Sequence, residues 1–428
     1  MLSKKNQERL WVVYFALLFF WSINAYIYIG KLFQSNELFA LKIDGKPYIS
    51  DFVNAYGAGI LAKKNLTQPT PIYDRATQYK VQCQIIAPIK AEQPFYNQYP
   101  PYMFLLYLPL AWVSLQKAWL IWTTFSLFFI ATASGFALKP WYKEKFAPLI
   151  AATARLSNYP VWLSFRLGQT SLFITPVVTL FYHALAGKRF IWTGLFASLA
   201  LLKLQYVPVL AAVGIAIGGL HFLAGLAIGT IILTALAYRV LGKDNLLAFP
   251  QAILGGETGT AVSGVAAEMM QNVRGILVLL SGGDGQLVHI AAAICCVLAG
   301  LALFALWWKE RKTIMDKRER FDLLFALTLF TMLFTSVHTH IQDYMLAFLG
   351  CEIIWLSISS GSRKSNRYSK LDIWLKAAVL AFPLLSWPFF MLLPFLQLVK
   401  IQPFALWALA MIVLTALKLK ETDTSPDA

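Results

Sequence analysis

One acidic residue in the first polar segment stands where it could act as a base. Asp51 follows Ser50, a preferred N-cap residue, and precedes apolar residues at helical spacing. The pattern predicts an amphipathic helix over residues 49–62, lying on the membrane surface with Asp51 near the headgroups. Partial desolvation there raises a carboxylate pKa and improves it as a general base. Helix-start electrostatics, worth under about 1 kcal/mol, also accounts for an acid at this position.

Two basic residues stand in unusual surroundings. Arg166 precedes Gly168 and Gln169 in an irregular segment, and Lys203 interrupts an otherwise apolar run. A charge at membrane depth is costly, so it usually faces a cavity or a partner. The alternative is that both long side chains extend to the membrane interface.

A third polar group lies in a short turn near residue 340. His338, His340 and Asp343 place two imidazoles and a carboxylate close together. Two histidines at i and i+2 do not share a helix face, so the pattern does not predict a metal site. The turn is either a ligand-binding group or a polar loop between two spans.

The elements that must position these residues follow from composition. The chain has 428 residues, of which 58% are hydrophobic and 14% charged, and its mean hydropathy is +0.60. A soluble domain has about 25% charged residues, so lipid is the fitting solvent. Apolar runs approaching the ~20 residues of a membrane helix predict an all-α polytopic protein rather than a barrel.

The apolar runs predict roughly ten to thirteen spans in a single integral membrane domain covering residues 1–428. The segment 138–168 is ambiguous between extra crossings and a re-entrant piece. The expected spans are 10–30, 101–116, 117–138, 169–187, 189–206, 207–220, 221–241, 286–308, 321–336, 342–360, 371–387 and 402–418.

Charge distribution predicts the orientation. The net charge of +16 comes largely from short basic loops such as 309–320 and 363–370. This is the pattern of cytosolic loops, not of nucleic-acid binding. Both termini are then cytosolic, and two large loops, 31–100 and 242–285, lie on the opposite face.

Several chemistries are disfavoured by missing motifs. No phosphate-binding P-loop, dinucleotide fingerprint, HExxH or GxSxG is present, and no Asp-x-Asp pair could hold a metal-bound nucleotide sugar. The four cysteines show no metal-ligand spacing. An ATP-driven pump and a nucleotide-sugar enzyme are therefore disfavoured, whereas a lipid-linked substrate is not.

An ordered set of short motifs resembles a known family. The set comprises Asp51-Phe52 with Tyr56, Ile72-Tyr73-Asp74, Tyr99-Pro100-Pro101, Pro160 followed by Gly168-Gln169, Lys203 before Pro208, and the turn His338–Tyr344. In this order and spacing the chain resembles the bacterial GT-C glycosyltransferases of family 87, of the polyprenol-phosphate-mannose-dependent α-mannosyltransferase type. It departs from the pattern at Lys63-Lys64-Asn65, where a glycine is expected.

The resemblance implies a GT-C-like architecture and a metal-independent, cofactor-free, inverting glycosyltransferase. Its donor would be a polyprenyl monophosphate sugar, mannose by inheritance from the family, on the non-cytosolic face of a bacterial inner membrane. The acceptor would be a lipid-linked or cell-envelope glycan. A pentose donor such as arabinose would leave the same traces.

The resemblance also implies roles for individual residues. Asp51 matches the catalytic aspartate, and one carboxylate suffices because phosphate is a good leaving group. The departing phosphate needs positive charge or hydrogen-bond donors. Its candidates are Arg166, Lys203, His338 and His340, and the candidates for substrate binding are Tyr56, Tyr99, Gln169 and Asp343.

Two other functions remain open. A secondary transporter or flippase often carries inverted repeats, and none is visible here. A membrane polysaccharide polymerase or ligase would rely on a large late loop, whereas the richest polar loop follows the first span. Asp51 discriminates between them, because only the glycosyltransferase requires it.

Overall fold

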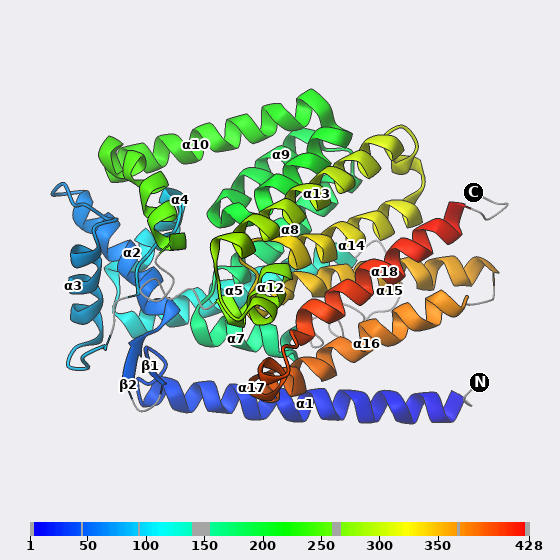
Figure 1. Cartoon of the computed structure of the whole chain (residues 1–428), viewed down its shortest axis with the longest axis horizontal. Helices are drawn as coiled ribbons and strands as arrows, with labels where there is room; N and C mark the ends of the chain where they lie inside the picture. The colour runs from blue at the N-terminus through cyan, green and yellow to red at the C-terminus, as the bar shows by residue number, and fades with distance from the viewer. Residues whose placement is uncertain are drawn as a thin grey trace.

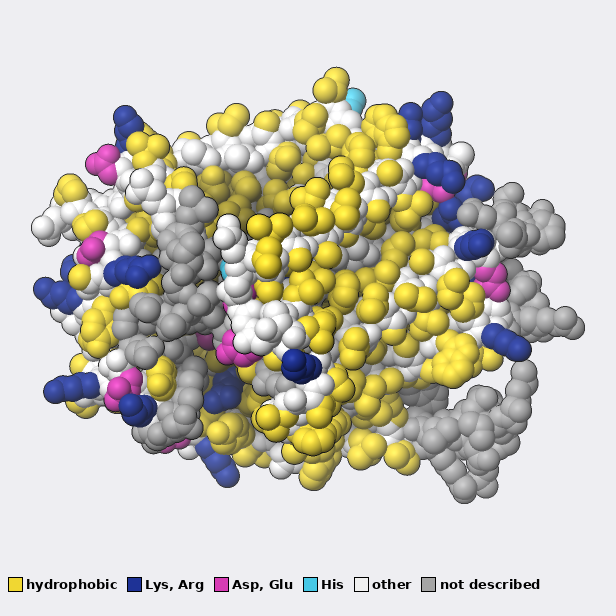
Figure 2. Space-filling model, in the orientation of Figure 1, with side chains coloured by type: hydrophobic (Ala, Val, Ile, Leu, Met, Phe, Trp, Pro, Cys, Tyr) yellow, Lys and Arg dark blue, Asp and Glu magenta, His cyan; other side chains and the backbone are white. Residues whose placement is uncertain are grey.

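The chain forms an elongated bundle of helices that run along its long axis (Figure 1). A computed structural model describes residues 4–43, 46–92, 95–138, 155–258, 267–365 and 369–423. Both termini lie at one end of the bundle, and the small elements β1, β2, α2 and α3 lie at the other. Apolar side chains cover much of the middle of the visible face, and Lys, Arg, Asp and Glu gather towards the two ends (Figure 2).

The all-α prediction is confirmed, with one short hairpin added. The elements in chain order are α1 Lys4–Gln34, β1 Ala40–Ile43, β2 Lys46–Ile49, α2 Asp51–Asn65, α3 Arg75–Ile86, α4 Pro101–Tyr107, η1 Leu108–Trp112, α5 Leu115–Leu138, α7 Tyr159–Leu167, α8 Ser171–Ala186, α9 Phe190–Leu199, η2 Ala200–Tyr206, α10 Val207–Thr258, η3 Ala267–Met269, α12 Val273–Ser281, α13 Gln286–Glu310, η4 Ile314–Asp316, α14 Arg318–Thr335, η5 Ile341–Tyr344, α15 Met345–Ser365, α16 Lys370–Met391, α17 Leu393–Leu398 and α18 Pro403–Asp423.

Within the described residues, six segments are long and apolar enough to cross a membrane. The longest, Phe190–Ile253, has 64 residues. As one straight helix it would measure about 96 Å, three times the hydrocarbon thickness of about 30 Å. Its backbone instead leaves helical geometry at Lys203, Gly219 and Gly242. The breaks at the two glycines match the predicted span ends at 220 and 241.

One expected span needs correction. The predicted span 101–116 is a short apolar stretch over Pro101–Trp112, because the helix α4 tightens into η1 and stops before Val113. Within the expected loop 242–285, the described residues include the end of α10, up to Thr258, and α12. Much of the ambiguous segment 138–168 lies outside the described residues; its last part forms α7.

The hairpin sets the position of Asp51. β1 pairs with β2 in antiparallel register, with Ala40 opposite Ile49. Ser50 extends the ladder by donating its N–H to Phe39 O at 3.3 Å. The chain then turns into α2, so the first residue of this helix is anchored to the end of the hairpin.

Candidate active site

The helix that carries Asp51 begins as predicted but is buried on almost every side. The Ser50 hydroxyl accepts a hydrogen bond from the Val53 N–H at 3.3 Å, which confirms the cap. The expected two-sided pattern is wrong, because ten of the fifteen residues of α2 are buried. Small residues make this possible: a Cβ at Gly59 would lie 2.4 Å from Tyr107 O on α4. α2 is therefore a packed element that carries Asp51 in its first turn.

Gln169 holds the Asp51 carboxylate. Its Nε2 donates to Asp51 Oδ1 at 2.7 Å, and its own side chain is buried. Gly168 ends α7 in the left-handed conformation, with φ of +63°, and thereby turns Gln169 back towards α2. A Cβ at Gly168 would lie 2.4 Å from the Phe52 ring, so this position also needs the absence of a side chain. The predicted pair of Gly168 and Gln169 thus serves to orient Asp51.

The environment of Asp51 suits a base that works near neutral pH. Burial raises the pKa of this carboxyl from 3.8 to about 6. A hydrogen bond from its own backbone, the Gln169 amide and the charge of Lys203 each oppose that rise. The carboxylate is ionised at neutral pH, yet it is basic enough to accept a proton.

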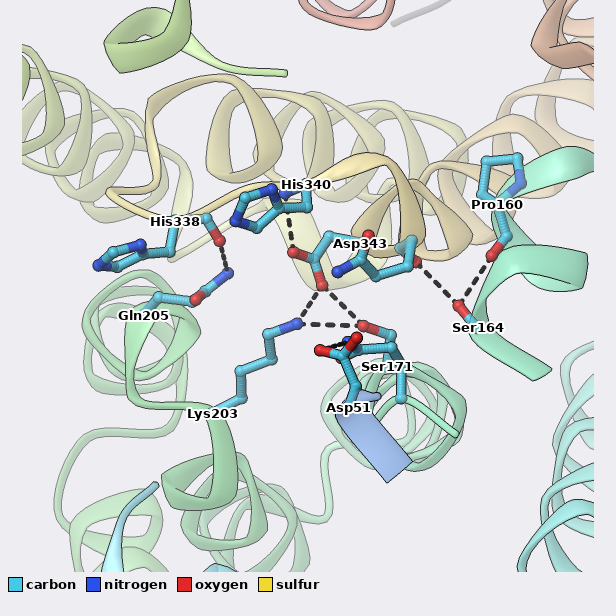
Figure 3. Close-up of polar contacts among 11 residues, drawn as sticks. Asp51, Pro160, Ser164, Ser171, Lys203, Gln205, His338, His340 and Asp343 are labelled. Carbon is cyan, nitrogen blue, oxygen red and sulfur yellow. Dashed lines mark hydrogen bonds and ion pairs between the residues drawn. The ribbon is translucent and has the colours of Figure 1, made fainter. Parts of the chain in front are cut away.

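Lys203 belongs to a second polar group, made of Lys203, Asp343 and Ser171 (Figure 3). Its ammonium forms an ion pair with Asp343 and donates to Ser171 Oγ at 3.1 Å. The Ser171 hydroxyl donates to Asp343 Oδ1 at 2.7 Å. Asp343 is 1% exposed and Lys203 is 16% exposed, so only the cation retains access to a ligand. An ammonium has three N–H donors, and these two contacts use two of them.

The backbone break at Lys203 explains how a lysine is accommodated in an apolar run. Its φ of −139° and ψ of 81° interrupt η2 and direct the side chain towards the turn containing Asp343. Lys203 therefore faces a partner, as expected for a charge in an apolar run.

His340 is not the cationic ligand that the sequence suggested. Burial, together with nearby cations, lowers the pKa of His340 to about 4, although Asp343 opposes the change. His340 is therefore a neutral imidazole at pH 7, and it contributes a hydrogen-bond group rather than a positive charge. The backbone carbonyl of His338 accepts a hydrogen bond from the Gln205 side-chain amide. The backbone N–H of His340 donates to Asp343 Oδ2 at 3.1 Å. Both bonds fix the shape of the turn.

Three other predicted residues occupy different positions. Arg166 lies over the Trp162 ring at 5.8 Å, and no contact joins it to Lys203 within the described residues. Tyr56 donates its hydroxyl to Val113 O at 2.6 Å, which ties α2 to the segment after η1. Burial and the charge of Asp51 raise the pKa of Tyr99, so this phenol lies within electrostatic reach of the carboxylate.

Two residues of the site were not anticipated. Ser171 accepts a hydrogen bond from Lys203, and Gln205 donates to the backbone carbonyl of His338. Each lies two positions after a predicted residue, Gln169 or Lys203, within an apolar helical segment. A polar side chain inside such a run is the signal that points to them. Among the described residues, no group of three His, Cys, Asp or Glu could hold a metal ion.

Comparison with known families identifies the chain. The family model of glycosyltransferase family 87 matches residues 97–337, more than half of the sequence. The chain belongs to glycosyltransferase family 87. It is therefore a membrane glycosyltransferase, and the resemblance seen in its motifs is confirmed at the level of the family. No curated protein and no solved structure matched it.

The matched range covers part of the site. Gln169, Ser171 and Lys203 lie inside it, whereas Asp51 and Asp343 lie outside. In this family 87 glycosyltransferase, hydrogen bonds and an ion pair join the outer residues to the matched ones. Gln169 and Lys203 therefore lie within the family match and also contact the two site residues outside it, Asp51 and Asp343.

Proposed function

We propose that the protein is an inverting glycosyltransferase that moves a sugar, mannose in the first instance, from a polyprenyl monophosphate to a lipid-linked or cell-envelope glycan. The observation that carries the proposal is the Asp51 carboxylate, held by Gln169 and close enough to Lys203 to be affected by its charge. A base and a cation within electrostatic reach of each other suit a reaction that removes a proton and releases a phosphate.

The reaction needs one base and one anion site. Asp51 takes the proton of the acceptor hydroxyl, and the oxygen attacks the anomeric carbon of the donor sugar. The bond between this carbon and the phosphate oxygen breaks, and polyprenyl phosphate leaves with the electron pair. The remaining N–H of Lys203 would bind the phosphate oxygens, with His338, His340 and Arg166 as further donors. Attack from the face opposite the phosphate inverts the anomeric configuration.

The proposed location is a bacterial inner membrane, with both termini in the cytosol. Lys188 forms an ion pair with Asp316 at 3.2 Å, and Arg320 donates to Leu419 O at 3.0 Å. Two basic loops and the C-terminal helix therefore meet at one end, as cytosolic segments should. Asp51 directly follows the hairpin, which lies at the opposite end of the molecule (Figure 1). With both termini in the cytosol, that end faces away from the cytosol.

Donor use is the direct test. The purified chain in nanodiscs would receive labelled polyprenyl-phosphate mannose, polyprenyl-phosphate arabinose or GDP-mannose, together with membrane-extracted acceptor lipids. We expect transfer from a lipid donor, and a product whose anomeric configuration, read by NMR, is opposite to that of the donor. Transfer from GDP-mannose but from neither lipid donor would contradict the proposal. A product that keeps the anomeric configuration of the donor would also contradict it.

A further inference from the structure

A pocket lined by polar and aromatic side chains lies near α2 and shares none of its residues with the Asp51 and Lys203 groups. Its volume is about 300 Å³, within the range of about 300–1,000 Å³ typical of ligand pockets. The start of α3, the loop 95–98 and the last part of α10 form its walls. The reaction proposed above uses no part of it.

The wall chemistry fits a neutral polyhydroxylated ligand. Gln98 and Gln251 line the pocket, and within the described part of the chain no hydrogen bond engages either side-chain amide. Each amide offers two donors and two acceptors, which matches the donor and acceptor character of sugar hydroxyls. Tyr73 and Tyr96 add ring surface against which the C–H faces of a sugar can pack.

The charges in the pocket balance. Among the described residues, Asp74 and Arg75 are the charged ones that line it. Asp74 Oδ2 accepts two hydrogen bonds from Thr77, and the Arg75 guanidinium lies over the Tyr96 ring at 4.6 Å. A pocket without excess positive charge is a poor phosphate site, so its ligand is more saccharide than lipid headgroup.

Internal hydrogen bonds hold the walls in place. Gln78 donates to Ile72 O at 2.9 Å and accepts the Asn97 N–H at 2.6 Å. Asn245 accepts the Ile72 N–H at 3.1 Å and donates to Thr70 O at 3.0 Å. These bonds join α3, the loop 95–98 and α10 into one frame, so the pocket exists before any ligand arrives.

The pocket is connected to Asp51 through the same loop. Asn97, in the pocket wall, donates to Asn54 O at 3.5 Å, one helical turn after Asp51. Its side-chain oxygen accepts the N–H of Tyr99 at 2.8 Å. Tyr99 is the phenol within electrostatic reach of Asp51. An acceptor chain lying along this loop would reach from the pocket to the base.

We propose that this pocket binds a neutral sugar unit of the acceptor glycan, at some distance from the hydroxyl that is presented to Asp51. The inference rests on the proposed function for its role in transfer. It assigns to Gln98, Gln251, Tyr73 and Tyr96 the recognition of an acceptor that is already glycosylated.

Binding without donor tests the pocket. Saturation-transfer NMR would measure mannotriose, arabinotriose and maltotriose with the full chain in a detergent without a sugar headgroup. Ala252→Trp fills the pocket wall, and Ala235→Trp is the matched control on the exposed face of α10. We expect at least one trisaccharide to bind the wild type and the control equally, and Ala252→Trp to weaken it by about tenfold or more.

A milder variant guards against misfolding. Gln251→Ala removes one hydrogen-bonding group from a half-open wall and should weaken binding by about fivefold, the effect of one lost hydrogen bond. Gel filtration and thermal unfolding would show that each variant is folded. Binding of no trisaccharide by the wild type, or unchanged binding by Gln251→Ala and folded Ala252→Trp, would overturn the proposal.

The same samples separate the two proposals. Asp51→Asn should retain trisaccharide binding while losing sugar transfer. If the trisaccharide binds as expected but Asp51→Asn transfers sugar normally, the proposed reaction fails and the pocket stands. If Asp51→Asn is inactive but no trisaccharide binds, the pocket assignment fails and the reaction stands.

Discussion

Gln169 Nε2 donates to Asp51 Oδ1 at 2.7 Å and so joins two residues that are 118 positions apart in the chain. The bond stabilises the ionised carboxylate and fixes its direction. It also connects an N-terminal segment to the region that defines the family.

Removing this bond should change the pH dependence of transfer. In Gln169→Leu the ionised form of Asp51 loses a donor, so we expect its pKa to rise and the acidic limb of the kcat/KM profile to move to higher pH. Gln116→Leu is the control, because Gln116 makes a comparable amide contact to Asn36 at an exposed position. A Gln169→Leu profile that coincides with the wild type would contradict this role.

The wild-type profile itself has a predicted midpoint. Protonated Asp51 cannot accept the acceptor proton, and its pKa is about 6. Transfer should therefore rise with pH through about 6 and level off above it. Initial rates between pH 4.5 and 8, with donor and acceptor well below saturation, would measure it. A midpoint near 4, the ordinary value for aspartate, would show that burial does not tune this group.

The Lys203 and Asp343 pair should show strong coupling. Lys203→Met leaves the buried Asp343 without its cation, which typically costs about 3–5 kcal/mol in the free energy of unfolding. Adding Asp343→Asn removes the stranded charge and should recover part of the loss. Thermal unfolding of both single variants and the double variant would measure this, and purely additive losses would contradict a functional ion pair.

Gly168 should tolerate no side chain. In Gly168→Ala the φ of +63° and the 2.4 Å approach to Phe52 both oppose the new Cβ, so we expect a loss of about 1–3 kcal/mol and weaker transfer. Gly300→Ala is the control, since it lies inside α13 with nothing within 4 Å of the new atom. Equal unfolding temperatures for the two variants would contradict this account.

Local features of the fold were predictable because they depend on neighbouring residues. Ser50 followed by Asp51 indicated a helix start, and the α2 cap confirms it. The apolar runs indicated span ends at 220 and 241, and the backbone breaks next to them, at Gly219 and Gly242. Lys203 indicated either a cavity or partner or a side chain extended to the membrane interface, and it forms an ion pair with Asp343.

Features that depend on tertiary packing were not predictable. The sequence of α2 predicts an amphipathic helix, but α3 covers its polar side: Gln82 donates to Asn54 Oδ1 at 3.1 Å, and a Cβ at Gly57 would lie 3.5 Å from Ile85. The contacts of Asp51 with Gln169, and of Ser171 with Asp343, join segments more than 100 positions apart. No local pattern encodes such pairings, although the order of the motifs indicated which residues belong to the family.

The most direct test of the central claim is sugar transfer by Asp51→Asn at equal expression, with labelled polyprenyl-phosphate mannose. Glu92→Gln is the matched control, an exposed acid at the same end of the molecule that pairs with Lys46. We expect a loss of about 10²–10⁴-fold in Asp51→Asn, the usual contribution of a general base, and unchanged transfer in Glu92→Gln. Wild-type transfer by folded Asp51→Asn would contradict the assignment of Asp51 as the base.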